Sequence, residues 1–161
     1  MRGDITLSIS VPAALEALKS AKDALQVLAE WKRKNKGDAR ALIIEIEENF
    51  RYLRMVAFDE VPLSDVVESL AVDEYKRLAR EGFNFNQLQK KKIKDDPSFE
   101  KSQLSSWVGK STEELIDSIY SKITDLRILY PHNKTNEKYR WGVRVKIIIK
   151  LIWLLLKHVQ G

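Results

Sequence analysis

The residues best placed to do chemistry form a basic cluster near the carboxyl end of the chain. Lys134, Lys138, Arg140 and Arg144 all lie in the segment LRILYPHNKTNEKYRWGVR, where we expect a helix to begin. The first turn of a helix carries roughly half a unit of positive charge, so basic side chains are unfavourable there unless an anion compensates them. Free N–H groups in that turn are themselves suited to binding an anion. The cluster therefore predicts a contact surface for a phosphate-bearing ligand or an acidic protein partner.

Two interpretations of the arginines remain open from the sequence. Arg140 and Arg144 are four residues apart, on the side of the predicted helix that faces the core. That position also favours internal ion pairs with carboxylates elsewhere in the chain, for which the candidates are Glu45, Glu48, Asp117 and Asp125. Tyr139 and Trp141 stand between the basic residues, where they are suited either to stacking on a base or to burial.

A second candidate site is Arg127-Ile-Leu-Tyr-Pro-His132, near the end of the penultimate predicted helix. Its Arg-x4-His spacing resembles the motif of HEPN domains, small helical bundles of which many are metal-independent ribonucleases in bacterial toxin and antiphage systems. The resemblance implies that Arg127 and His132 act at the scissile phosphate of RNA, usually across a homodimer. The chain departs from the family pattern at Ile128, where a polar residue is typical, and at Pro131 inside the motif.

The composition argues against several other kinds of site. The chain has no cysteine, which excludes thiolate catalysis and cysteine-ligated zinc. Its only histidines are His132 and His158, and it contains no phosphate-binding glycine loop, HExxH or nucleophile elbow. We therefore expect no metal and no cofactor. We expect His158 to lie at the edge of the core near a helix C-terminus, where its positive charge would be favoured.

The net charge of +5 is concentrated at the carboxyl end of the chain. Residues 132–161 carry seven lysines and arginines and one glutamate, and the remainder is close to neutral. Such a concentration attracts phosphate or acidic protein surfaces. The N-terminus MRGDITLSIS lacks the apolar core of a signal peptide, and the longest uncharged run in the most apolar segment is only Leu151 to Leu156. We therefore expect a cytoplasmic protein with no membrane span.

Hydrophobic periodicity predicts an all-α, single-domain bundle of four main helices around an apolar C-terminal helix, with an irregular excursion at about 83–110. The predicted helices are one at about 11–35, one capped by Asp38, one from a cap at Ser64 to Gly82, one from a capping box at Ser111 to Pro131, and one over Tyr139 to Val159 capped by Thr135 or Asn136. Asn49 interrupts the apolar side of the second helix, and we expect its amide to bond to backbone or water or to fix helix pairing.

These patterns concern packing and a basic surface more than catalysis. We therefore expect a non-enzymatic interaction or regulatory module, with a HEPN-like ribonuclease as the alternative. The sequence leaves open whether the protein forms a homodimer and whether nucleic acid is among its ligands.

Overall fold

A computed structural model describes residues 23–100 and 102–161, and over these ranges the protein is all-helical with no β-strand, as the periodicity predicted. Residues 23–34 are helical and form the described part of the predicted first helix. The other α-helices are α2 (Gly37–Phe58), α3 (Leu63–Val66), α4 (Asp73–Arg80), α5 (Thr112–Leu129) and α6 (Trp141–Gln160). No helix in the described ranges is long and apolar enough to cross a membrane.

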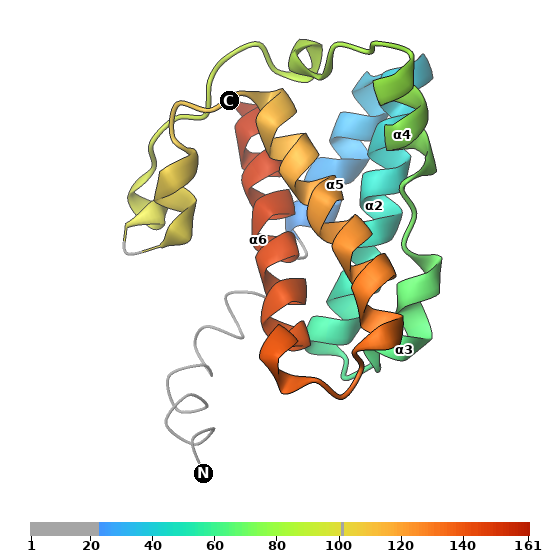
Figure 1. The fold of residues 1–161 in the computed structure, drawn as a ribbon. Helices are drawn as coiled ribbons and strands as arrows, with labels where there is room; N and C mark the ends of the chain where they lie inside the picture. The colour runs from blue at the N-terminus through green and yellow to red at the C-terminus, as the bar shows by residue number, and fades with distance from the viewer. Residues whose placement is uncertain (1–22, 101) are drawn as a thin grey trace.

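The apolar helix α6 packs against both α2 and α5 (Figure 1). Aliphatic residues repeat along α6 with helical spacing, so they bury one broad side of it. The buried residues are Val145, Ile148, Leu151, Ile152, Leu154, Leu155 and Leu156. Lys146 and Lys150 lie on the opposite side and are exposed. The helix therefore has a broad enclosed side and a narrow solvated stripe.

The predicted continuous helix from Ser64 to Gly82 is wrong. After α3 the chain forms a 3-10 turn, η1 (Val67–Ser69), becomes extended at Leu70 and starts α4 only at Asp73. This break allows Val67, Leu70 and Val72 all to be buried. Ser64 is not the cap of α3, because Pro62 occupies the N-cap position and no side chain caps this short helix.

Asn49 on α2 holds the break between α3 and α4. Its Nδ2 donates to the carbonyl oxygen of Ala71 at 2.7 Å, and its Oδ1 accepts from the Ala71 N–H at 2.8 Å. The Asn49 side chain is 0% exposed. The prediction that this amide bonds to backbone is therefore confirmed, and the polar residue on the apolar side of α2 serves to fix an irregular connection.

Of the N-cap residues predicted for α5 and α2, one is confirmed and one is wrong. Ser111 caps α5 as predicted, since its Oγ accepts from the Glu114 N–H at 3.2 Å. The predicted Asp38 cap of α2 is wrong, because α2 begins at Gly37 and Asp38 lies within its first turn. Short polar residues at a cap and in a first turn have similar sequence signatures, which explains the error.

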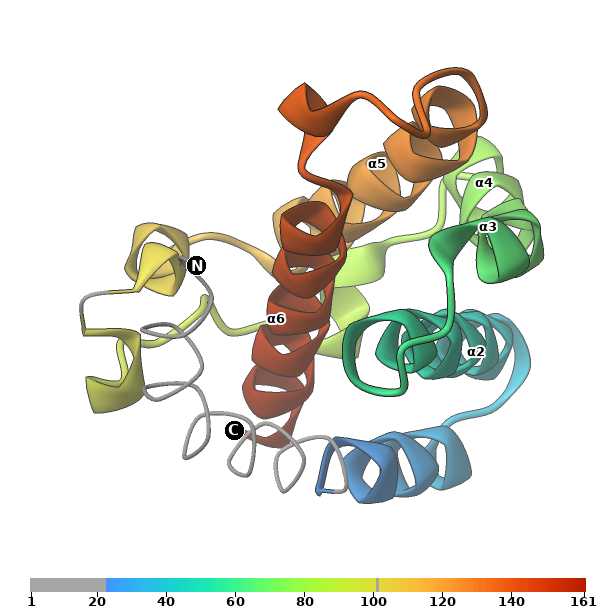
Figure 2. The ribbon, with the colours of Figure 1, turned by 90° about the horizontal axis from the view of Figure 1, so that it is seen from below.

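The described residues of the excursion between α4 and α5 form three short 3-10 turns, η2 (Phe85–Leu88), η3 (Pro97–Phe99) and η4 (Gln103–Trp107). Figures 1 and 2 both place η3 and η4 beside α6, on the side away from α4. Four apolar side chains anchor the excursion to the core: Phe85, Ile93, Phe99 and Leu104. The excursion thus covers part of α6 near its carboxyl end.

Candidate functional site: the basic junction between α5 and α6

The four predicted contact residues lie together at the amino-terminal end of α6. The chain leaves α5 through the 3-10 turns η5 (Tyr130–His132) and η6 (Glu137–Tyr139) before α6 begins (Figure 2). Lys134, Lys138 and Arg140 are exposed, whereas Arg144 is half-buried. We call these four residues the basic junction. Three of them are available to a partner, and the fourth has structural contacts of its own.

The backbone at the start of α6 leaves the helix terminus without a side-chain cap. Arg140 occupies the N-cap position with φ +47°, in the left-handed region, and its side chain does not cap the helix. A non-glycine residue in that region costs about 1–3 kcal/mol. The predicted capping of α6 by Thr135 or Asn136 is wrong, because Asn136 instead caps η6 by accepting from the Lys138 N–H at 3.1 Å. The amino-terminal end of α6 therefore has no capping side-chain oxygen, and the segment before it carries Lys134, Lys138 and Arg140 together with one exposed acidic residue, Glu137.

Three aromatic rings form the base of the junction. The rings of Tyr139 and Trp141 stack with their centroids 4.8 Å apart and their planes 2° from parallel. Tyr130 meets Trp141 edge-on, with centroids 5.2 Å apart. The Trp141 Nε1 donates to the carbonyl oxygen of Asn133 at 3.0 Å, which satisfies the indole N–H. Tyr139 and Trp141 are both half-buried, so the pair combines internal packing with some exposed ring surface.

Arg144 holds this aromatic pair in place. Its Nε donates to the carbonyl oxygen of Tyr139 at 2.6 Å, and its guanidinium carbon lies 5.3 Å from the Tyr139 centroid and 5.6 Å from the Trp141 centroid. Both distances are within the range of cation–π attraction. Arg144 is thus a positioning residue, and Lys134, Lys138 and Arg140 supply the freely exposed charge.

The internal ion pairs proposed for the two arginines do not form. Glu45 accepts hydrogen bonds from two backbone N–H groups at the start of α4, at 2.9 and 3.2 Å. Asp117 accepts a hydrogen bond from the Tyr75 hydroxyl at 2.6 Å. Partial burial of Tyr75 raises its pKa, and this hydrogen bond raises it further. Within residues 23–100 and 102–161, no carboxylate lies within 4.0 Å of a nitrogen of Arg140 or Arg144, including those of Glu45, Glu48, Asp117 and Asp125.

The second candidate pair, Arg127 and His132, is exposed at the end of α5 and in η5. Arg127 borders a depression of about 370 Å³ that Glu68 and Lys76 also line, but His132 does not line it. The side chains of Arg127 and His132 form no hydrogen bond or ion pair with another described residue. Both are accessible, and a single chain does not bring them into one depression.

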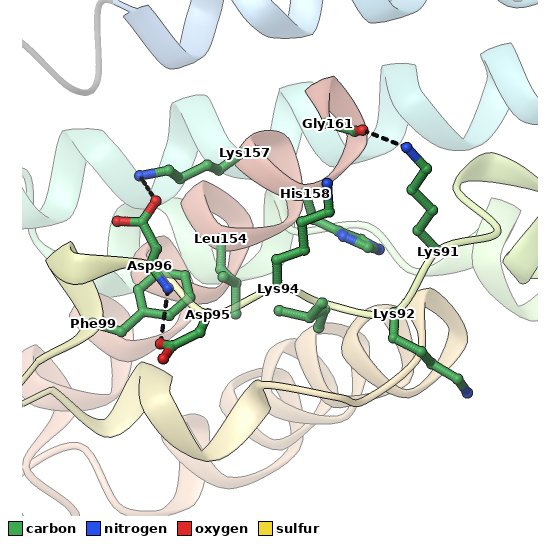
Figure 3. Close-up of a pocket in the computed structure, with 11 residues that line it drawn as sticks. Lys91, Lys92, Lys94, Asp95, Asp96, Phe99, Leu154, Lys157, His158 and Gly161 are labelled. Atoms are coloured by element: carbon green, nitrogen blue, oxygen red, sulfur yellow. Dashed lines mark hydrogen bonds and ion pairs between the residues drawn. The ribbon is translucent and has the colours of Figure 1, made fainter.

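A cavity of about 160 Å³ lies between the segment 91–96 and the last turns of α6 (Figure 3). The Lys91 ammonium donates to the carbonyl oxygen of Gly161 at 3.3 Å, and Lys157 pairs with Asp96 at 2.8 Å. Lys157 and the hydroxyl and N–H of Ser98 hold the pKa of Asp96 well below its usual range. Cations at a helix C-terminus interact favourably with the negative end of the helix dipole. Lys91 and Lys157 therefore stabilise α6, and their positions need no ligand to explain them.

His158 borders this cavity as part of a hydrogen-bonded chain. Its Nε2 lies 2.8 Å from the Thr112 hydroxyl, which itself donates to the carbonyl oxygen of Gln89 at 2.6 Å. The Thr112 hydroxyl has one proton, which it donates to Gln89, so it can only accept a hydrogen bond from His158. The Nε2 atom of His158 must therefore carry a hydrogen. Burial lowers the pKa of His158. The expectation that its charge would be favoured is therefore wrong, because burial disfavours the charged form.

Two residues that the sequence did not single out as contacts extend the basic surface. Lys146 and Lys150 are exposed on α6 and form no ion pair within the described ranges. The signal available in the sequence was the complete absence of aspartate and glutamate from Lys138 to the last residue. No group of three or more histidine, aspartate or glutamate side chains in the described part of the chain is arranged to hold a metal ion.

Comparisons of the chain with protein-family models, curated proteins and solved structures found no match. Its function therefore has to be inferred from its own residues.

Proposed function

We propose that this protein is a non-enzymatic interaction or regulatory module whose helices form a single-domain bundle around α6. In this proposal the basic junction binds an anionic partner, either a phosphate-bearing ligand or an acidic protein surface. One observation carries the proposal: the junction gathers its cations at the positive end of a helix, and neither Arg140 nor Arg144 has a carboxylate partner in the described ranges.

The electrostatics of this arrangement favour an external anion. An anion near a helix N-terminus gains typically 0.3–1 kcal/mol from the dipole, and each hydrogen bond to a charged group contributes about 1.5–3 kcal/mol. Exposed Lys134, Lys138 and Arg140 supply charged donors in the segment that leads into the uncapped terminus. An anion bound there would offset both the mutual repulsion of the cations and their unfavourable interaction with the dipole.

The test is a titration with inorganic polyphosphate and with polyglutamate, using the wild-type protein and a triple variant, Lys134→Gln, Lys138→Gln and Arg140→Gln. Each phosphate contact on a flexible polyanion contributes about fivefold at 0.1 M salt if counterion release is as large as on single-stranded nucleic acid. Loss of three contacts should therefore weaken polyphosphate binding by about 100-fold. Arg144 is left intact because it positions the aromatic pair.

The matched control is Lys76→Gln with Arg80→Gln, which removes two exposed cations from α4. Figure 1 places α4 away from α6. This control should bind as the wild type does. If neither polyanion binds, or if the triple variant retains full affinity, the basic junction is not a contact surface.

The alternative function is a HEPN-like, metal-independent ribonuclease that uses Arg127 and His132. The exposure of both side chains supports it, because each is accessible to RNA or to a second copy of the chain. Proton transfer and stabilisation of phosphate charge must converge on one site. RNA incubated with the protein and a chelator should then be cleaved, and cleavage should be lost with Arg127→Ala and with His132→Ala. Intact RNA, or cleavage that survives both substitutions, would exclude this activity.

A further inference from the structure

The outer side of α6 carries two lysines that pair with no carboxylate in the part of the chain that the structure describes. Lys146 and Lys150 lie one turn apart on the side opposite the core, and neither forms an ion pair within the described ranges. The third lysine on this stripe, Lys157, differs because it pairs with Asp96 at 2.8 Å. The uncompensated stripe therefore runs from the amino-terminal end of α6 to about its middle.

We infer that the anionic partner of the basic junction is a nucleic acid whose phosphate backbone continues along α6 past Lys146 and Lys150. This inference rests on the proposed function and specifies its ligand. Arg140 and Lys150 are separated by about 15 Å along the helix axis, and Lys146 and Lys150 by about 6 Å. Positive charges repeated over that length suit a chain of phosphates better than a single phosphate group.

The surface formed by the basic junction, Lys146 and Lys150 lacks the apolar core that is typical of a protein interface. Specific protein interfaces usually have an apolar core in which a few large side chains contribute most of the affinity. The large apolar side chains exposed in the described ranges are scattered over the molecule: Ile44, Met55, Val108, Ile128 and Val143. Of these, only Val143 adjoins the lysine stripe, and the apolar residues Ile147, Ile149 and Trp153 next to the two lysines are half-buried. A contact made mainly by cations is instead typical of binding to a nucleic-acid backbone.

A membrane surface and a small ligand fit less well. A helix that lies on a membrane presents large apolar side chains beside its basic residues, whereas the leucines of α6 are directed into the core. Four cavities between described residues are lined by other segments, and none of these four includes a residue of the basic junction, Lys146 or Lys150. The half-buried stack of Tyr139 and Trp141 beside the cations suits the bases of a single strand.

The salt dependence of binding measures how many of these cations contact phosphate. With five contacts, from Lys134, Lys138, Arg140, Lys146 and Lys150, the slope of log K against log salt should be about −3.5 for a single strand. Affinity for a labelled 20-nucleotide RNA should then fall about 100-fold between 50 and 200 mM salt. In the variant Lys146→Gln with Lys150→Gln, the slope should be about −2.1 and the fall about 20-fold. Lys76→Gln with Arg80→Gln has the same spacing on α4 and should leave the slope unchanged.

Parallel titrations with single-stranded DNA, duplex DNA and duplex RNA identify the preferred nucleic acid, and polyglutamate tests the acidic-protein alternative. Polyglutamate that binds as tightly as RNA of equal charge would overturn the inference. So would an unchanged salt slope in the Lys146 and Lys150 variant. If the Lys146 and Lys150 variant binds RNA as the wild type does while the triple junction variant loses affinity, the inference fails and the proposed function stands. If both variants bind as the wild type does, the inference and the proposed function both fail. Circular dichroism establishes that each variant is folded.

Discussion

Replacement of Asn49 by alanine should destabilise the protein strongly, because it removes both hydrogen bonds that hold the chain between α3 and α4. The Asn49 side chain is 0% exposed, and its amide satisfies the N–H and the carbonyl of Ala71. A buried polar backbone group left without a partner costs about 1–3 kcal/mol. Ala71 is half-buried, so water can partly replace the amide, and about 1.5 kcal/mol, in the lower half of that range, applies to each of the two groups. We expect the free energy of unfolding to fall by about 3 kcal/mol.

Urea unfolding followed by circular dichroism measures this loss, and the melting temperature should fall by about 6–12 °C for a chain of this length. Asn84→Ala is the matched control, because the exposed Asn84 side chain makes one local hydrogen bond to the Asn86 N–H. That change should cost less than about 1.5 kcal/mol. A loss below about 1 kcal/mol for Asn49→Ala would contradict the assignment of Asn49 as the residue that fixes this break.

Two further predictions concern histidine titration and the aromatic stack. Since burial lowers the pKa of His158 in the folded state from 6.5, the unfolded chain binds more protons below that pH, and the free energy of unfolding should decrease as the pH falls below about 6.5. Urea titrations between pH 5 and 8 should show a weaker decrease for His158→Gln; an identical pH dependence would contradict this origin. Arg144→Ala should loosen the stack of Tyr139 and Trp141, with a loss of about 0.5–2 kcal/mol from cation–π attraction. The near-ultraviolet circular dichroism of the aromatic rings should weaken, whereas Arg140→Ala should leave that signal unchanged; equal spectra for the two variants would exclude the positioning role.

Helical periodicity located the long helices but not the break between α3 and α4. Val67, Leu70, Tyr75 and Leu78 have spacing that is compatible with one continuous helix. The structure instead interrupts the helix because Asn49, distant in the sequence, supplies both partners for the Ala71 backbone. A hydrogen bond between segments this far apart leaves no local sequence pattern, so tertiary contacts overrode a correct local period.

The positions of the basic residues could be read from the sequence, whereas the electrostatic predictions that depended on burial and tertiary contacts were wrong. The crowding of basic residues near the start of the last helix could be predicted because all of them lie in one segment. The role of Glu45 could not, since this carboxylate on α2 binds the N–H groups of α4 instead of an arginine. His158 shows the same limit: its place near a helix end could be predicted from the sequence, but the burial that lowers its pKa depends on packing.

The two ends of α6 provide a comparison within one helix. At the carboxyl end, Lys91 binds a carbonyl oxygen and Lys157 pairs with Asp96, so the cations there complement the dipole and have partners. At the amino end the dipole has the opposite sign, no acidic residue lies in the first turn, and Arg140 has no carboxylate partner within the described ranges. If the lysines and arginines of α6 served only to keep a hydrophobic helix soluble, both ends would tolerate acidic residues, and the amino end would favour them. The absence of acidic residues from the first turn of α6, where they would stabilise the helix, therefore supports the proposal that an external anion binds at this end.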